Sequence, residues 1–394
     1  MRRSLFILLS IFLCSSTRAA TYLAASVEFS DVSNAVAQAT NHGDTVVLPS
    51  GSAIWTNQLT LNKTISIIGQ TQIEGQFDHY TNGTTTTGSL TLLTSSATNS
   101  WIGRNIHCSE KIADETVVAS VVNGVSATLS KVATSSGTNL KFTVTYKITN
   151  GTIIDDRITE TGSLTRDIFR YTATIGYTPL IQGITFDRSH SPIGVGVQLH
   201  LLGTNHTFRI TQCVFENHNT VNLSRYSFYQ EGDILGVMDH CYSIQYSGSE
   251  KFSVNHEQYN ATPYTDGQAS WTEGPNWYPN TGKAFFFDDM EMVGANGNDH
   301  GFTDGQHGGR SVHRYSYFYK CRDGNHGCET GHSGMRMRES YGNYYDYGNT
   351  SFTSSLRSAT FMAWGNQIYS TITIIGWQMV VNRARIGTAP GNGN

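Results

Sequence analysis

The stretches FRITQCVF, residues 208–215, and GVMDHCYS, residues 236–243, share one arrangement of side chains. In each, a residue expected to point inward is followed by two polar or small residues, by a second inward residue, and by a third two positions further on. The inward positions are Ile210, Cys213 and Phe215 in the first stretch and Met238, Cys241 and Ser243 in the second. Such registered slots predict a solenoid, because each coil stacks its side chains on the identical slots of the next coil.

The same arrangement recurs along the second half of the chain. It is repeated in LIQGITF (180–186), FFFDDMEM (285–292), SVHRYSYF (311–318), ESYGNYYDY (339–347) and FMAWGNQI (361–368). The steps between stretches have the length of one coil of three short strands, except for a longer step between Cys241 and Met290. We expect Cys213 and Cys241 to be buried neighbours in the stack, and His313, which occupies an inward slot, to be a core residue.

Composition also favours strands. The chain has 39 glycines against 7 prolines, with many Thr, Ser, Asn and Tyr residues, a balance typical of strands and turns. One short amphipathic helix is predicted near the start, capped by Ser30 or Asp31 and stopped by Gly43. Its apolar face is expected to hold Val32, Ala35, Val36 and Ala39. Short strands follow at once, so the helix is expected to cover the open end of the solenoid.

Residues 1–20 have the charge, apolar run and small residues of a secretory signal peptide. Arg2 and Arg3 precede an apolar run that is too short to span a bilayer. We therefore expect a secreted protein, extracellular or periplasmic, with no membrane span. The formal net charge of −4 becomes more negative without this leader, which argues against nucleic acid as a partner.

We expect residues 21–394 to form a single, monomeric domain with two interruptions. Residues 107–170 hold alternating strands at shorter spacing than the coils, which predicts an antiparallel strand insertion or irregular coils. Residues 247–282 account for the long step and predict a long loop. Trp271 and Trp277 in this loop can stack on sugar rings, as substrate-binding residues, or pack the loop against itself.

Together these features resemble the right-handed parallel β-helix of the pectate-lyase-like superfamily. The likeness covers the expected helix with GDTVVLPSG (43–51), the ladder of coils from about Leu180 to Ile368, and GVMDHC, which is similar to an element of pectate lyases. It implies an all-β fold: a right-handed parallel β-helix (solenoid) with a short N-terminal capping helix. It implies less about the reaction, because the same coil carries lyases, hydrolases, esterases and non-catalytic spikes.

A stretch rich in histidine and glycine, HGFTDGQHGGR at residues 300–310, connects two of the coils. Residues 300–340 contain six Arg and Lys against four Asp and Glu, together with five of the fourteen histidines. A positive patch on an acidic solenoid suits an anionic extracellular polysaccharide as the partner. We expect His307 and Arg310 to border the substrate, and His326 and Arg336 to extend the positive strip along the next coil.

One column of outward positions places charged residues beside one another on successive coils. Asp239, Asp288 and Arg314 each follow the first inward residue of their coil, and neighbouring strands of a sheet lie about 4.8 Å apart. Asp289 occupies the next position. A structural role is the alternative, because aspartates at turns hydrogen-bond local backbone and arginines pair with them.

Two kinds of chemistry fit this constellation. In a lyase of uronate-containing, pectin-like polysaccharide, Asp288, Asp289 and Asp239 hold a Ca²⁺ ion that acidifies the uronate, and Arg314 or Arg336 removes the α-proton. In a glycoside hydrolase, two carboxylates act as acid and as base or nucleophile. The lyase is the first expectation, and a non-catalytic carbohydrate-binding or spike-like surface β-helix is the alternative from another class. The candidate catalytic residues are Arg314, Arg336, His326, Asp288 and Asp289.

Overall fold

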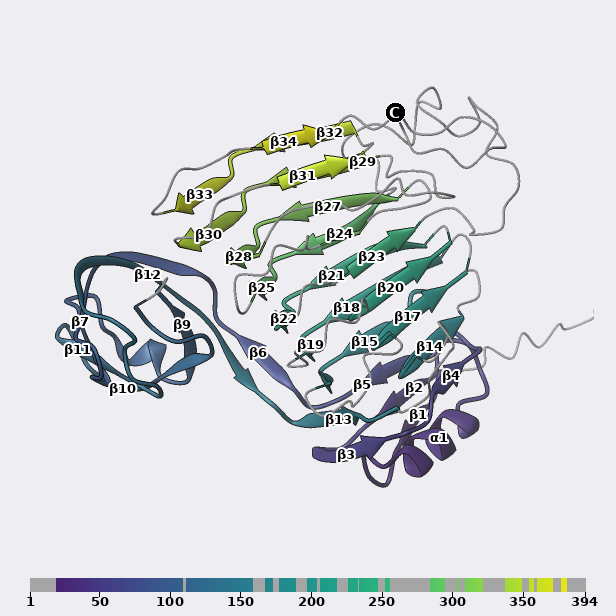
Figure 1. Ribbon diagram of the computed structural model, residues 1–394. Coiled ribbons are helices and arrows are strands. Elements are labelled where there is room, and N and C mark those ends of the chain that lie inside the picture. The colour runs from purple at the N-terminus through teal and green to yellow at the C-terminus, as the bar shows by residue number, and fades with distance from the viewer. Residues whose placement is uncertain are drawn as a thin grey trace, which may run out of the picture.

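The computed structural model describes residues 19–108, 111–158, 167–172, 177–188, 197–203, 206–217, 226–232, 234–246, 252–255, 284–294, 303–304, 309–321, 337–348, 354–357, 360–370 and 377–380. Within these residues the chain winds through three parallel sheets, A, B and C, and an antiparallel sheet D stands beside them (Figure 1).

Sheet A runs the length of the solenoid. In order across the sheet its strands are β1 (Thr21–Leu23), β2 (Thr45–Val47), β5 (Ser66–Ile68), β15 (Leu180–Gln182), β18 (His206–Thr211), β21 (Ile234–Asp239), β24 (Phe285–Asp288), β27 (Arg310–Arg314), β29 (Met337–Tyr341) and β32 (Thr360–Trp364). Each pair of neighbours is parallel, as stacked coils require.

Sheets B and C supply the other two sides of the coils. Sheet B consists of β3 (Gly51–Trp55), β13 (Thr152–Asp156), β16 (Thr185–Asp187), β19 (Val214–Asn217), β22 (Tyr242–Gln245), β25 (Glu291–Gly294), β28 (Tyr317–Tyr319), β30 (Tyr344–Gly348) and β33 (Gln367–Ser370). Sheet C consists of β4 (Leu59–Leu61), β14 (Phe169–Thr172), β17 (Leu199–Leu202), β20 (Phe228–Glu231), β23 (Phe252–Asn255) and β26 (Thr303–Asp304). Near the C-terminal end, β31 (Ser354–Arg357) pairs with β34 (Trp377–Val380).

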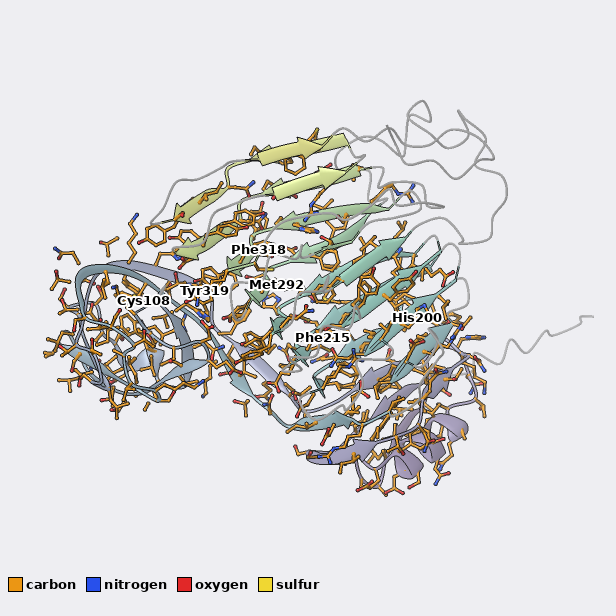
Figure 2. All side chains as sticks on the ribbon, in the orientation of Figure 1. Cys108, His200, Phe215, Met292, Phe318 and Tyr319 are labelled. Atoms are coloured by element: carbon orange, nitrogen blue, oxygen red, sulfur yellow. The ribbon has the colours of Figure 1, made fainter. Side chains whose placement is uncertain are left out.

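The register confirms the predicted slots. Ile210 is paired with Met238, Met238 with Phe287, and Phe287 with His313. The triplets from Ile181 to Tyr345 are all buried, whereas Ala363 in the last of the seven stretches is exposed. Figure 2 shows three members of the third slot, Phe215, Met292 and Phe318, rising one above another inside the solenoid. The prediction of a parallel β-helix is therefore confirmed, and its right-handed winding stays a prediction.

The expected helix is α1 (Phe29–Gln38), which covers the open end of the first coils (Figure 1). Val32 and Ala35 are buried against the solenoid core. The predicted caps were wrong: the helix begins after Glu28, and the Asp31 carboxylate accepts a hydrogen bond from Ser26 Oγ at 2.6 Å. Within the part of the chain that the structure describes, no helix is long and apolar enough to cross a membrane.

Sheet D is inserted between β5 of sheet A and β13 of sheet B. Its strands are β6 (Gln72–Glu74), β7 (Asp78–Thr85), β8 (Thr91–Leu93), β9 (Arg104–His107), β10 (Thr116–Val122), β11 (Ser126–Leu129) and β12 (Gly137–Thr149), with a short 3-10 helix, η1 (Asn99–Trp101). The long strand β12 pairs with both β7 and β9, which closes the sheet into a barrel around its own core.

The boundaries of both interruptions differ from those expected. The antiparallel strands begin at Gln72 and end at Thr149, whereas 107–170 was expected, because β13 and β14 are parallel strands of the coils. Residues 252–255 form the sheet C strand β23, so part of 247–282 continues the solenoid. Trp271 and Trp277, and residues 1–18 of the expected signal peptide, lie outside the described residues.

The barrel packs against the outer face of sheet B. His107 Nε2 lies 2.6 Å from Glu291 Oε1, and both side chains are buried. Lys320 pairs with Asp114 at 2.9 Å. Around these polar contacts lies an apolar cluster that includes Ile73 and Tyr146 of the barrel and Val214, Tyr242, Ile244, Val293, Tyr317 and Tyr319 of the coils. The insertion therefore braces several successive coils at once.

Candidate functional site

Five outward side chains form a straight column at the ends of the sheet A strands. Asp239, Asp288, Arg314, Tyr341 and Trp364 are paired in register from β21 to β32. Each follows a buried inward residue, so strand alternation turns its side chain to the outer face. We call these five residues the sheet A strip. Over its four steps the strip extends for about 19 Å.

The residue after each strip position bends the chain from sheet A into sheet B. Its backbone is left-handed in every coil, with φ of 49° at His240, 52° at Asp289, 53° at Tyr315 and 66° at Gly342. A side chain in this conformation costs roughly 1 kcal/mol relative to glycine, and the ladder on either side holds it there. At Gly342 a Cβ would lie 2.7 Å from the Tyr315 ring, so the missing side chain makes room for that tyrosine.

Arg314 is at the centre of the strip and is fixed from both sides. Its Nη2 donates to Asp288 Oδ2 at 2.7 Å, and its Nη1 donates to Tyr341 Oη at 3.1 Å. Its guanidinium also lies over the Phe286 ring, 4.9 Å from the centroid. Burial lowers the pKa of Arg314, but the hydrogen bonds with Asp288 and Tyr341 raise it more, so it stays above its ordinary value. A raised pKa is the opposite of what a general base needs.

The aspartates of the lower coils are paired in the same way. Arg209 Nη2 lies 2.9 Å from Asp239 Oδ2. The two nitrogens of His240 face two carboxylates: Nδ1 is 3.4 Å from Asp239 and Nε2 is 3.0 Å from Asp289. Tyr146 of the barrel donates to the backbone carbonyl of Asp289. The inserted barrel therefore reaches the edge of the strip and fixes one of its turns.

Two carboxyl groups at this surface have a raised pKa. Burial raises the pKa of Asp289, and the charges of Asp288 and Asp239 add to this, while His240 opposes it. Glu339, which is 2% exposed, lies two residues before Tyr341 on β29. Burial raises its pKa also, against the opposing charge of Arg314. The sequence analysis missed Glu339, although strand alternation from Tyr341 places it on the outer face.

The upper end of the strip is aromatic. The Tyr341 and Trp364 rings are stacked with centroids 4.2 Å apart and planes at 10°. Tyr315 meets Tyr341 edge to face at 5.6 Å. Trp364 is 47% exposed and Tyr315 is 56% exposed, so the rings form a platform open to solvent. These aromatics were part of the predicted column but were not assigned a role.

The carboxylates expected to hold Ca²⁺ do not fit that ion. The side chains of Asp239, Asp288 and Asp289 each already face a cationic or histidine partner on a neighbouring position. Calcium needs six to eight oxygen ligands gathered around one point. No group of three or more His, Cys, Asp or Glu side chains among the described residues is placed to hold a metal ion. We therefore derive no step through calcium.

The remaining predicted site residues fall into two groups. Arg310 is only 6% exposed, so it is not an open substrate contact, and Arg338 of the expected positive patch points into the core. Of the arginines counted toward that patch, Arg314 is the one that the structure places on the strip, and Asp288 neutralises it. Outside the described residues lie His307, His326 and Arg336.

Comparisons with known proteins give only distant matches. No family model matches the chain, and no curated protein matches it in sequence. Among solved structures it is similar to "Geobacillus virus E2 - ORF18", at 10% identity and a TM-score of 0.31, over 89% of this chain and 58% of that one. It is also similar to the Gp54 tailspike of Acinetobacter baumannii bacteriophage AP22 in complex with A. baumannii capsular saccharide, at 8% identity and a TM-score of 0.19, over 89% of this chain and 70% of that one.

The chain thus spans less than two thirds of the length of the first of these proteins. Both TM-scores are too low for either likeness to indicate a function. The case for function rests on the sheet A strip.

Proposed function

We propose that the protein is a carbohydrate-binding β-helix that holds a polysaccharide along the sheet A strip. The observation that carries the proposal is the solvent-exposed aromatic platform of Tyr315, Tyr341 and Trp364 in direct line with the fixed Arg314–Asp288 pair. Sugar rings pack an apolar face on aromatic rings while their hydroxyls bond to charged side chains, and a pre-formed network loses little entropy on binding.

The shape of the strip supports a chain-like ligand. Its positions repeat once per coil along a straight line, so a polymer lying parallel to the solenoid axis meets successive side chains at a regular spacing. The platform and the charged positions then act as adjoining subsites. An isolated monosaccharide would contact only part of the strip, so affinity is expected to rise with chain length.

The charge of the strip supports an uncharged saccharide. Its aspartates Asp239 and Asp288, with Asp289 beside them, face Arg209 and Arg314, and each of the two arginines is already bonded to a carboxylate. The described surface therefore offers no excess positive charge to an anionic chain. The anionic partner and lyase chemistry stay predictions that depend on His326 and Arg336.

A panel of neutral and acidic polysaccharides, tested with and without chelator, examines this proposal. Tyr315→Ala is expected to weaken binding to the best neutral polymer at least tenfold, whereas Tyr177→Ala should not. Tyr177 is a matched control, because it is 50% exposed but lies away from the strip, against His42. Equal binding by both variants, or binding confined to acidic polymers, would refute the proposal.

A glycoside hydrolase is the second candidate, favoured by the two carboxyls of raised pKa. A protonated carboxyl such as that of Asp289 or Glu339 can donate its proton to the leaving oxygen while another carboxylate activates water. The same polysaccharide panel distinguishes the outcomes. New reducing ends that disappear in Asp289→Asn or Glu339→Gln indicate hydrolysis, unsaturated ends indicate a lyase, and retention without cleavage indicates binding alone.

A further inference from the structure

His200 lies on sheet C, on the side of the solenoid away from the barrel (Figure 2). Its strand β17 is hydrogen-bonded to β14 on one side and to β20 on the other. In this register Arg170, His200 and Tyr229 form one outward column. The side chain is nevertheless covered, since His200 is only 7% exposed. It is therefore a buried titratable group that joins three successive coils.

Each ring nitrogen of His200 faces a carboxylate from a different neighbouring coil. Nδ1 lies 2.7 Å from Asp167 Oδ2, just before β14, and Nε2 lies 3.7 Å from Glu231 Oε2, at the end of β20. A neutral imidazole has a proton on one nitrogen and a lone pair on the other, so it would present that lone pair to a carboxylate. The doubly protonated ring presents a donor to both. The geometry alone therefore favours the charged form.

Few other groups compensate for this charge. Arg170 Nη1 is 3.9 Å from Asp167 Oδ2, too far for a hydrogen bond, and the Tyr229 ring meets His200 edge to face at 5.0 Å. Asp167 is fully buried, and its Oδ1 has no hydrogen-bond partner. Burial lowers the pKa of His200, but the bonds to Asp167 and Glu231 raise it more, and Arg170 only partly opposes them. Loss of the proton would leave a buried carboxylate nearly uncompensated.

We propose that Asp167, His200 and Glu231 form a pH-sensitive latch that fastens three successive coils of sheet C and loosens as the pH rises. Because the folded-state pKa is raised above the ordinary value of 6.5, the stabilisation is fully present below about pH 6.5 and is lost as the pH climbs through the folded-state pKa. Each unit of that rise makes the unfolding equilibrium constant about tenfold larger on the alkaline side.

The protonation state can be measured directly on the full chain. With ¹⁵N-labelled histidine, His200 is assigned as the imidazole signal that His200→Gln removes. We expect that signal to show two protonated nitrogens at pH 6.5 and to titrate above this value. A ring with one protonated nitrogen at pH 6.5, or a midpoint below it, overturns the proposal. This measurement is decisive even if the substituted protein is less stable, because the titration is recorded on the unsubstituted chain.

Hydrogen exchange then tests whether the proton fastens the coils. Between pH 6 and pH 9, after correction for intrinsic exchange rates, opening of peptides from β17 and β20 should increase at least tenfold in the unsubstituted protein. His200→Gln should show that opening already at pH 6, with little further change. His42→Gln is the matched control, because His42 is an exposed histidine beside the first coils and should leave the profile unchanged. Equal opening of β17 and β20 at both pH values in the unsubstituted protein refutes the latch.

Discussion

The lower and upper coils of the solenoid fill the same inward slots with different chemistry. In the lower coils the first slot holds Ile181, Ile210, Met238 and Phe287, and in the upper coils it holds His313 and Ser340. All six side chains are buried. The register continues unchanged across the boundary, so the repeated backbone path defines the slot and apolarity does not.

The two halves are held by different forces. In the lower half, aromatic rings stack along the axis, as Phe186 does on Phe215 at 5.3 Å and 11°. In the upper half a hydrogen-bonded network replaces them. Arg338 Nη2 lies 2.9 Å from His313 Nδ1, Thr303 Oγ1 lies 2.9 Å from His313 Nε2, and Asn343 Nδ2 donates to the His313 carbonyl at 3.0 Å. Apolar stacking tolerates truncation gradually, whereas a buried network fails when one partner is lost.

The largest effect is expected from a charge in the apolar half. Phe215→Asp should prevent folding, because it removes a stacked ring and buries a carboxylate for which the surrounding residues Phe186 and Phe252 offer no partner. Deleting a buried phenylalanine alone costs about 3–5 kcal/mol, comparable with the whole stability of many domains. Soluble yield and near-UV circular dichroism measure the outcome, with Phe215→Leu as the control that should fold. A folded Phe215→Asp protein would contradict the assignment of this slot to the core.

Arg338 offers the corresponding test in the polar half. Arg338→Ala should destabilise the protein by about 3 kcal/mol, because it leaves the His313 ring without its donor and opens a cavity. Arg338→Met fills the space and should cost less, since a buried charge is removed together with its desolvation penalty. Denaturant midpoints of the two variants measure the difference. A larger loss for Met than for Ala would show that the network is not what holds the upper coils.

The sequence predicted the corner between sheets A and B in detail because every coil passes it in the same number of residues. Sheet C escaped prediction because the connections before it differ in length from coil to coil. The contact of His107 with Glu291 joins positions far apart in the chain, and no local pattern indicates it. Arg338 was placed in an outward positive patch, although alternation from Ser340 places it inward. Charge composition was allowed to outweigh strand period, and the period was right.

The polar half should also be the more sensitive to acid. His313 Nδ1 accepts a hydrogen bond from Arg338, so the ring must be neutral, and burial together with Arg338 lowers its pKa well below 6.5. A histidine with a depressed folded-state pKa contributes stability above about pH 6.5 that is lost as the pH falls, by up to about 1.4 kcal/mol per unit.

Hydrogen exchange at pH 5 and pH 7 can follow residues 311–318 against residues 208–215. The upper peptide should open more at pH 5, opposite in sign to the alkaline opening expected at His200. Equal protection of the two peptides at both pH values would show that His313 does not make the upper coils acid-sensitive.

A smaller effect is expected from the cysteines of the lower half. Cys213 and Cys241 are fully buried neighbours, with the Cys213 amide 3.3 Å from Cys241 Sγ. Burial raises the pKa of the Cys241 thiol, so it should not react with a disulfide reagent until the protein unfolds. Cys241→Ala should cost about 1 kcal/mol, since one small apolar group is lost. Fast labelling of Cys241 in native buffer would show that the stack opens.

The smallest change in stability is expected on the strip, where the same strands turn their side chains to solvent. Asp288→Asn keeps the size of the side chain and weakens the bond to Arg314, whose side chain is 29% exposed. Partly exposed pairs contribute about 0–1 kcal/mol, so the denaturant midpoint should hardly move. Saccharide binding should fall much further, because Arg314 would lose the partner that orients it toward Tyr341. If stability falls by more than binding does, the Arg314–Asp288 pair is part of the scaffold, and the ligand lies elsewhere.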